Sequence, residues 1–169
     1  NASCPSSVDA YDCSTQSGFI QTRLNETQDG YDTVLLDTST NSFNPIWTFK
    51  KTITGTGDDE FTWLNGTAIH PTSGQAYGIM VFNNDDGTNN GNKQRYLVRF
   101  DSDTVEYVFT LDRVSSNGAF DNDGNFYWHQ HSTTDNQYPH TVWKIDNPDS
   151  ATGYSDRQDP AIPAAGTSI

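Results

Sequence analysis

The chain has 169 residues, a formal net charge of −13 and only 9 lysines and arginines, which excludes the clustered cations that binding to nucleic acid phosphates requires. Asp outnumbers Glu 19 to 3, and Ser and Thr together number 36, a composition that disfavours helices and favours strands joined by polar turns. We therefore predict an all-β protein whose acidic surface mainly confers solubility.

Ten strands are predicted in chain order from apolar alternation and from the turn residues that separate them. They span 18–24, 33–37, 46–52, 61–69, 75–82, 95–101, 104–112, 117–121, 125–131 and 141–146. We expect three regions: an N-terminal arm (1–17), a single all-β domain (18–154) and an extended C-terminal arm (155–169).

One hairpin shows the alternation clearly. Asp101-Ser102-Asp103 is predicted as a tight turn between two strands. In the second of these strands, apolar residues recur at every other position, so we expect them to line one face. They are Val105, Tyr107, Phe109 and Leu111.

Two kinds of segment recur along the chain. The segment 65–79 matches 117–128 once a one-residue gap is allowed at Thr72, and an apolar strand closed by Asp occurs at 34–37, 98–101 and 143–146. Such units stack on copies of themselves to bury a face. Grouped by these repeats, the strands number three, then four, then three, so we expect something outside the pattern to complete the series.

The motif Gly-Thr-Ala-x-x-Pro-x-Ser-Gly-x-x-Tyr-Gly (66–78), followed by Leu-Val-Arg-Phe-Asp (97–101), resembles the blade repeats of secreted β-propeller proteins. The resemblance covers about residues 18–146. It implies small four-stranded sheets arranged as blades. The chain departs from this pattern, because its predicted strands make fewer than the four or more blades of a closed propeller. A compact β-barrel or sandwich built from the same hairpins is the alternative.

Two cysteines, Cys4 and Cys13, are the only ones in the chain. Their spacing near the N-terminus, among Pro, Ser and Asp residues, predicts a disulfide-closed loop formed in an oxidising compartment. Two free thiols are the alternative, whereas a zinc site lacks further ligands at a suitable spacing. We therefore expect an extracellular or cell-surface protein.

Three N-glycosylation sequons begin at Asn1, Asn25 and Asn65. Asn25 is the best candidate for an N-linked glycan, because it lies in a polar loop before Asp29-Gly30. Asn65 lies within the predicted strand 61–69, where a glycan requires an outward-facing position.

Candidate metal ligands are few. His129 and His131 lie two apart on a predicted strand and so share a face, with His140 across a loop, but a polar sheet face explains this pattern better than a metal site does. The loops 83–87 and 121–124 resemble calcium loops without the downstream bidentate Glu, and a plain β-turn explains the second. We expect no cofactor, with calcium as the alternative.

No nucleophile elbow, phosphate-binding glycine loop or Ser-His-Asp signature is present, so we do not expect an enzyme. Adjacent acids such as Asp58-Asp59-Glu60 are typical of a solvated loop, with a fragment of a glycoside hydrolase as the alternative.

His70 has no evident partner. The four tryptophans are expected to pack in the core rather than to stack on sugars.

Open sheet edges invite pairing with another chain. We therefore expect a glycosylated structural protein that assembles with itself, head to tail, into a filament, sheath or surface layer. The predicted assembly residues are Ile162, Pro163 and Ile169 of the C-terminal arm.

No apolar run approaches the roughly 20 residues of a membrane helix, so membrane insertion is not expected. A secreted propeller-like binding module for carbohydrate or calcium is the alternative function.

Overall fold

A computed structural model describes residues 19–24, 30–37, 40–50, 61–82, 94–111, 115–130 and 141–168. In these residues all named strands pair antiparallel into three sheets. One 3-10 turn, η2 (Pro148–Ser150), is the only helical element in the same ranges. The all-β prediction is confirmed.

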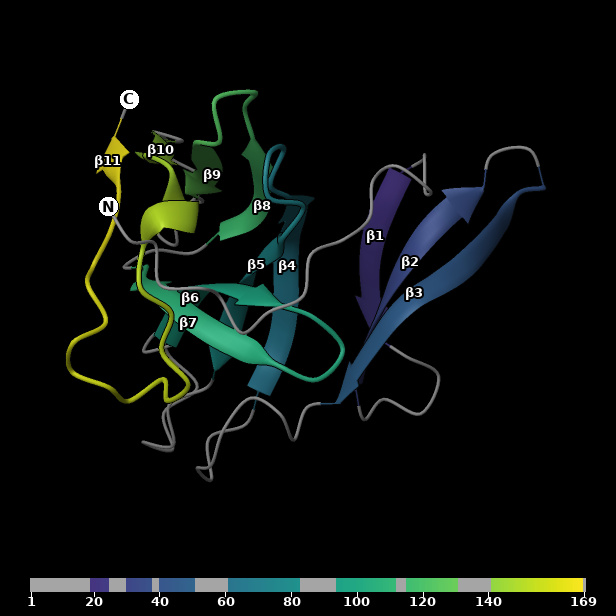
Figure 1. Ribbon diagram of the computed structural model, residues 1–169, viewed down its shortest axis with the longest axis horizontal. Helices are drawn as coiled ribbons and strands as arrows, with labels where there is room; N and C mark the ends of the chain where they lie inside the picture. Colours follow the sequence, from purple (N-terminus) through teal and green to yellow (C-terminus); the bar gives the residue numbers. More distant parts are fainter. Residues whose placement is uncertain are drawn as a thin grey trace, which may run out of the picture.

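The three sheets follow one another along the chain (Figure 1). The first contains β1 (Phe19–Leu24), β2 (Gly30–Asp37) and β3 (Ser42–Lys50); the second contains β4 (Phe61–Ile69), β5 (Ala76–Phe82), β6 (Gln94–Phe100) and β7 (Val105–Thr110); the third contains β8 (Ser115–Phe120), β9 (Phe126–Gln130), β10 (Thr141–Ile145) and β11 (Thr167–Ser168).

Each of the ten predicted strands has a counterpart, and the grouping into three and then four strands is confirmed. The third sheet differs from the prediction, because it has four strands rather than three. Its fourth strand, β11, comes from the C-terminal segment and pairs with β10 through Trp143 and Lys144. Among the described strands no sheet closes on itself, so the barrel alternative is wrong.

The second sheet lies between the other two and buries both of its faces. Along β6, Tyr96, Val98 and Phe100 belong to one hydrophobic cluster, which also contains Tyr31 of the first sheet, whereas Leu97 belongs to the other cluster, with Phe126 of the third. The alternation that the sequence predicts for β6 therefore divides its side chains between two cores.

In β7 the expected single apolar face is broken. The register between β6 and β7 shifts at Leu97 and Val98, so that Leu97 pairs with Phe109 and Val98 with Tyr107. This leaves Val108 as the extra residue of a bulge, and a one-residue shift turns later side chains to the opposite face. Val105 and Tyr107 accordingly enter one cluster, while Phe109 and Leu111 join Val108 in the other.

The tryptophans pack as predicted. Trp128 is buried and stacks on Trp143 with a centroid distance of 6.0 Å. Trp47 of the first sheet meets Phe100 of the second edge-on, at 6.4 Å. Trp63 is partly buried against both clusters. The Trp47 and Trp63 contacts join neighbouring sheets, whereas the stack of Trp128 on Trp143 lies within the third sheet.

The C-terminal segment folds back onto its own chain. Tyr154 and Tyr107 exchange two backbone hydrogen bonds of 2.9 and 2.7 Å, and Thr110 N–H donates to Pro163 O at 2.9 Å. Ile162 is buried in the cluster between the first two sheets. The segment therefore covers the outer edge of β7 and then that of β10. Ile169 lies outside the described residues, and a role of this segment between molecules stays a prediction.

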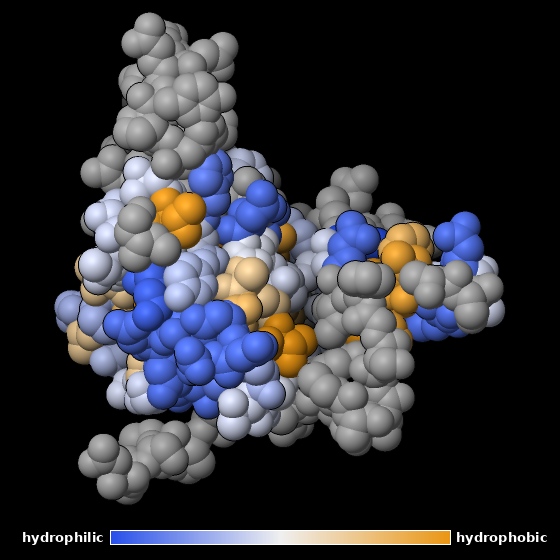
Figure 2. Space-filling model, turned by 90° about the horizontal axis from the view of Figure 1, so that it is seen from above, coloured by the Kyte–Doolittle hydropathy of each residue, from blue (hydrophilic) through white to orange (hydrophobic). Residues whose placement is uncertain are grey.

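The first sheet projects from the body of the molecule, and apolar residues reach its surface (Figure 2). Among the described strands, none pairs with the far edge of β3. This edge therefore differs from the outer edges of β7 and β10, which the C-terminal segment covers.

Candidate functional site

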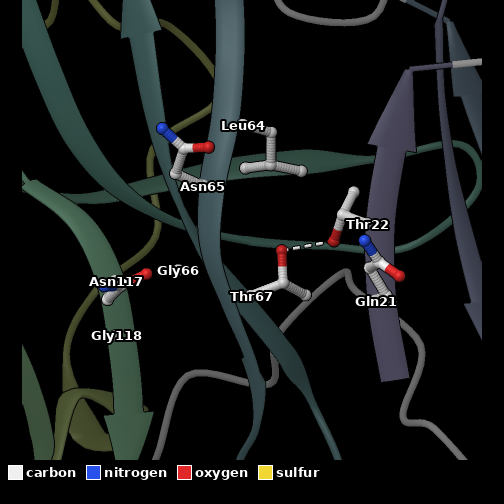
Figure 3. Close-up of a pocket in the computed structure, with 8 residues that line it drawn as sticks. All are labelled: Gln21, Thr22, Leu64, Asn65, Gly66, Thr67, Asn117 and Gly118. Carbon is white, nitrogen blue, oxygen red and sulfur yellow. Dashed lines mark hydrogen bonds between the residues drawn. The ribbon is translucent and has the colours of Figure 1, made fainter. Parts of the chain in front are cut away.

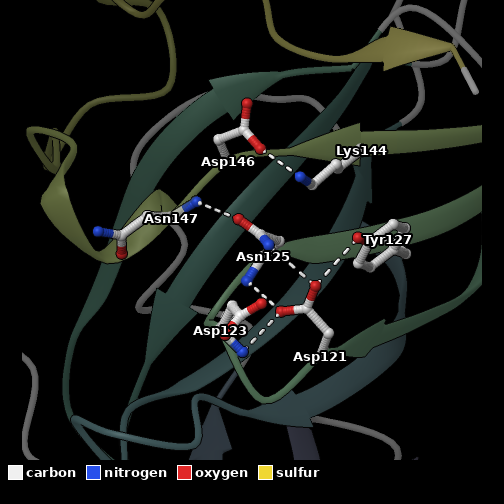
Figure 4. Close-up of polar contacts among 7 residues, drawn as sticks. All are labelled: Asp121, Asp123, Asn125, Tyr127, Lys144, Asp146 and Asn147. Atoms are coloured by element: carbon white, nitrogen blue, oxygen red, sulfur yellow. Dashed lines mark hydrogen bonds and ion pairs between the residues drawn. The ribbon is translucent and has the colours of Figure 1, made fainter.

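Asp121 closes the turn between β8 and β9 (Figure 4). Its Oδ1 accepts from the N–H groups of Asp123 (3.0 Å) and Asn125 (2.8 Å), and its Oδ2 accepts from Asn125 Nδ2 (2.9 Å) and the Tyr127 hydroxyl (3.0 Å). These hydrogen bonds, first of all that from the Asn125 side chain, lower the pKa of Asp121 to about 2. Both oxygens therefore act within the turn, as the plain β-turn interpretation predicts.

His70 takes the same role in the turn between β4 and β5. Its Nδ1 accepts from the N–H groups of Thr72 (3.3 Å) and Ser73 (3.1 Å), and His70 directly follows β4 as Asp121 directly follows β8. The contacts define Nδ1 as the acceptor and so place the proton of the neutral ring on Nε2. The buried Nε2 atom has no hydrogen-bond partner and faces Gly124, where an added Cβ would lie 2.6 Å away.

Ser73, His70 and Asp149 come together although no sequence signature predicts it. Ser73 Oγ donates to Asp149 Oδ1 at 3.0 Å and lies 3.1 Å from His70 Nδ1. The serine is thus the central residue, and its hydroxyl proton points to the carboxylate. A nucleophilic triad requires the histidine between serine and acid, so this arrangement joins η2 to the β4–β5 turn and does not activate the serine.

A buried polar network continues from Asp149 into the second sheet. The Tyr77 hydroxyl donates to Asp149 Oδ1 at 2.9 Å, and burial together with the Asp149 charge raises the pKa of Tyr77. Arg99 Nε pairs with Glu106 Oε2 at 2.5 Å in the buried interior. Desolvation lowers the pKa of Arg99, but hydrogen bonds to Glu106 and Tyr77 outweigh it and raise the pKa overall.

The inner strands β1, β4 and β8 surround a pocket of about 240 Å³ (Figure 3). Its lining is mostly polar and comprises Gln21, Thr22, Leu64, Asn65, Gly66, Thr67, Asn117 and Gly118. Sequence reasoning missed this pocket. The signal was available, since the aligned repeats each place Asn-Gly on the inner strand of a sheet, at 65–66 and 117–118.

The two glycines let the inner strands approach closely. Gly66 has a φ of +60°, and a Cβ there would lie 2.8 Å from Gly118 N; a Cβ on Gly118 would lie 3.0 Å from Gly66 O. Only a residue without a side chain fits such an approach. On the other side, the hydroxyl of Thr22 donates to that of Thr67 and joins β1 to β4.

The predicted site residues are divided between described and other parts of the chain. Asn65 is half-buried within β4, and its glycosylation stays a prediction. His129 is half-buried on β9. Cys4, Cys13, Asn1, Asn25, His131, His140 and the loop 83–87 lie outside the described residues.

Within the described ranges, no group of three or more His, Cys, Asp or Glu side chains is placed to hold a metal ion. The same ranges contain no helix long and apolar enough to span a membrane.

Among the side chains whose exposure the structure describes, two large apolar ones are exposed. Phe43 on β3 is 43% exposed and Val142 on β10 is 39% exposed. The Arg23 guanidinium lies 5.4 Å from the centroid of the Phe43 ring. The two residues belong to the two outer sheets, which Figure 1 shows towards opposite ends of the long axis.

Comparisons of the chain with models of protein families, with curated proteins and with solved structures find no match.

Proposed function

We propose that this protein is an extracellular structural subunit that assembles head to tail, through the open edge of its first sheet and the outer edge of its third. The observation that carries the proposal is the position of the two exposed apolar side chains, Phe43 and Val142, on the two end sheets. Contacts between different surfaces of identical copies propagate unless their rotation closes a ring.

The edge of β3 supplies the first half of the contact. In β3 the backbone faces no further described strand, and Phe43, Asn44 and Pro45 are exposed. Such an edge pairs readily with another strand. Pro45 cannot donate a hydrogen bond, so it limits pairing to part of β3.

The second half is the end of the molecule at β10 and β11. Thr167 and Ser168 of β11 are exposed, and Val142 precedes the stretch of β10 that β11 covers. A β3 strand from the next copy would extend this sheet and bury Phe43 near Val142.

The free energies of association show that the contact needs both strand pairing and burial of the apolar side chains. Association costs about 4–15 kcal/mol in lost freedom, and each new backbone hydrogen bond contributes about 1 kcal/mol net. Full burial of one large apolar side chain adds about 1.5–3 kcal/mol. Strand pairing alone is therefore weak, and the two apolar anchors decide the affinity.

The proposal is tested with Phe43→Ser and Val142→Ser in sedimentation velocity and negative-stain electron microscopy. Each substitution removes one anchor, so each is expected to raise the concentration needed for assembly by about 10- to 100-fold. Thr48→Ala serves as the matched control, because Thr48 is an exposed β3 residue that hydrogen-bonds only within its own sheet, to Asp32. Assembly of both serine variants at the wild-type concentration would contradict the proposal, as would a wild-type protein that stays monomeric.

A further inference from the structure

We propose that the pocket between β1, β4 and β8 binds a single ring of a neutral carbohydrate. The pocket lies among the inner strands, away from β3 and β10, so the inference does not depend on head-to-tail assembly.

The chemistry of the lining selects a neutral ligand. None of the eight lining residues is Asp, Glu, Lys, Arg or His, so a bound ion would meet no opposite charge and would lose its hydration without compensation. Gln21, Asn65 and Asn117 provide amide groups, and each amide carries both donors and acceptors. Neighbouring hydroxyls of a sugar also donate and accept, and therefore match amides better than an ion or an apolar molecule does.

The volume selects a small ligand. At about 240 Å³ the pocket is smaller than the roughly 300–1,000 Å³ of sites for drug-sized molecules. One pyranose ring suits this space. Leu64 is the one large apolar residue of the lining, and the C–H groups of a sugar ring can pack against it.

The walls of the pocket are held in place by contacts within the chain. The Thr22–Thr67 hydrogen bond joins β1 to β4, and the close approach of Gly66 and Gly118 joins β4 to β8. The Asn65 amide is fixed when its oxygen accepts from Trp63 Nε1 (3.1 Å) and its nitrogen donates to the Leu64 carbonyl (3.2 Å). A site fixed before binding loses less freedom when a ligand enters.

The experiment uses the indole N–H of Trp63 as a reporter in NMR titrations, because Trp63 touches the pocket residue Asn65. The full chain is produced without glycans and carries Phe43→Asp, which removes the proposed assembly contact, and sedimentation velocity verifies that the sample is monomeric. The probes are glucose, galactose, mannose and N-acetylglucosamine, with inorganic phosphate and calcium chloride as ionic probes.

Three further variants locate the site. Gln21→Trp fills the mouth of the pocket from an exposed position, and Gln21→Ala removes an amide without adding bulk. Asn44→Trp adds the same bulk at an exposed amide residue of β3, outside the pocket, and is the matched control. Circular dichroism and thermal denaturation verify that each variant is folded.

At least one sugar is expected to shift the Trp63 signal in a saturable manner. We expect Gln21→Trp to abolish the shift, Gln21→Ala to weaken binding about fivefold, and Asn44→Trp to leave it unchanged. The proposal is overturned if no sugar gives a saturable shift, if only phosphate or calcium does, or if Gln21→Trp and Gln21→Ala both bind like the parent.

A glycan attached to this chain could supply the same ring, since Asn65 belongs to a sequon and lines the pocket. In glycosylated protein, occupancy by its own glycan would give the shifted Trp63 signal without added sugar, whereas the same chain produced without glycans would lack that shift. An unshifted signal that responds only to added sugar would identify a free or external carbohydrate as the ligand.

Discussion

The His70 ring packs edge-on against the Phe120 ring with a centroid distance of 5.0 Å, and thereby joins the turn of the second sheet to the third sheet. The same ring accepts two backbone N–H groups of its own turn. One side chain therefore shapes a turn and holds two sheets together.

Substitution of His70 separates these two roles. His70→Ala removes both and is expected to lower the free energy of unfolding by about 3 kcal/mol. His70→Asn removes the ring but keeps a side-chain acceptor, like the one that Asp121 provides in the turn between β8 and β9, so it is expected to be about 1 kcal/mol less destabilising. Urea denaturation measures both. Equal destabilisation by the two variants would show that the acceptor contributes nothing.

The low pKa of Asp121 predicts a dependence of stability on acid. Its pKa is about 2 in the folded protein, against an ordinary value of 3.8. A carboxylate whose pKa is lowered by folding contributes stability above its unfolded pKa, and this contribution is lost as the pH falls through the folded value. The advantage of wild type over Asp121→Asn should therefore be constant above about pH 4 and shrink between pH 4 and 2.

This difference is measured by urea denaturation of both proteins across that range of pH. The other carboxylates titrate in both proteins, so they cancel in the comparison. A difference in unfolding free energy that does not change down to pH 2 would contradict the role assigned to Asp121.

The buried pair of Arg99 and Glu106 predicts a large effect of removing one charge. Glu106→Gln leaves the Arg99 guanidinium buried without its carboxylate and is expected to cost about 3–5 kcal/mol in unfolding free energy. The double variant Arg99→Met/Glu106→Leu removes both charges and should recover most of the loss. If the double variant were less stable than Glu106→Gln, the hydrogen bonds of Arg99 to Tyr77 and to the backbone carbonyl of Asp149 (3.5 Å) would outweigh the charge pair.

The C-terminal segment is predicted to contribute to stability through Ile162. Ile162→Ala removes a buried side chain from the cluster between the first two sheets and is expected to cost about 2–4 kcal/mol. The exposed neighbour Ala161 provides a control as Ala161→Ser. Chemical denaturation and limited proteolysis measure both variants. Wild-type stability of Ile162→Ala would mean that the segment does not pack on its own chain.

The strands could be predicted because their signals are local. Alternation along Tyr96 to Phe100 and the turn at Asp101 are readable from adjacent residues, and consecutive strands pair as a meander. Strand β11 could not be predicted, since Thr167 and Ser168 carry no alternation and their partners lie more than twenty residues away. The bulge at Val108 was missed because it depends on the register with Leu97 rather than on residues within β7.

The candidate site was predictable only in part. Both His70 and Asp121 directly follow the inner strand of a hairpin and accept backbone N–H groups of the turn, but the repeat alignment does not pair them, and the packing of His70 on Phe120 depends on how two sheets meet. The pocket likewise requires β1, β4 and β8 to converge, and no single segment encodes that. Phe43 lies on β3, the end strand of the first sheet, and Val142 lies on β10 just before the stretch that pairs with β11, so the exposure of both depends on which strands pair in each sheet.

The most direct test of head-to-tail assembly mixes two blocked variants. Phe43→Asp blocks the contact at β3 and Val142→Asp blocks the contact at β10, so each variant alone is expected to be monomeric. In a mixture, the intact β3 end of the Val142→Asp copy can still join the intact β10 end of the Phe43→Asp copy. Sedimentation velocity should therefore show heterodimers in the mixture and no larger species. Homodimers of a single variant, or a mixture that contains only monomers while the wild type assembles, would contradict the account.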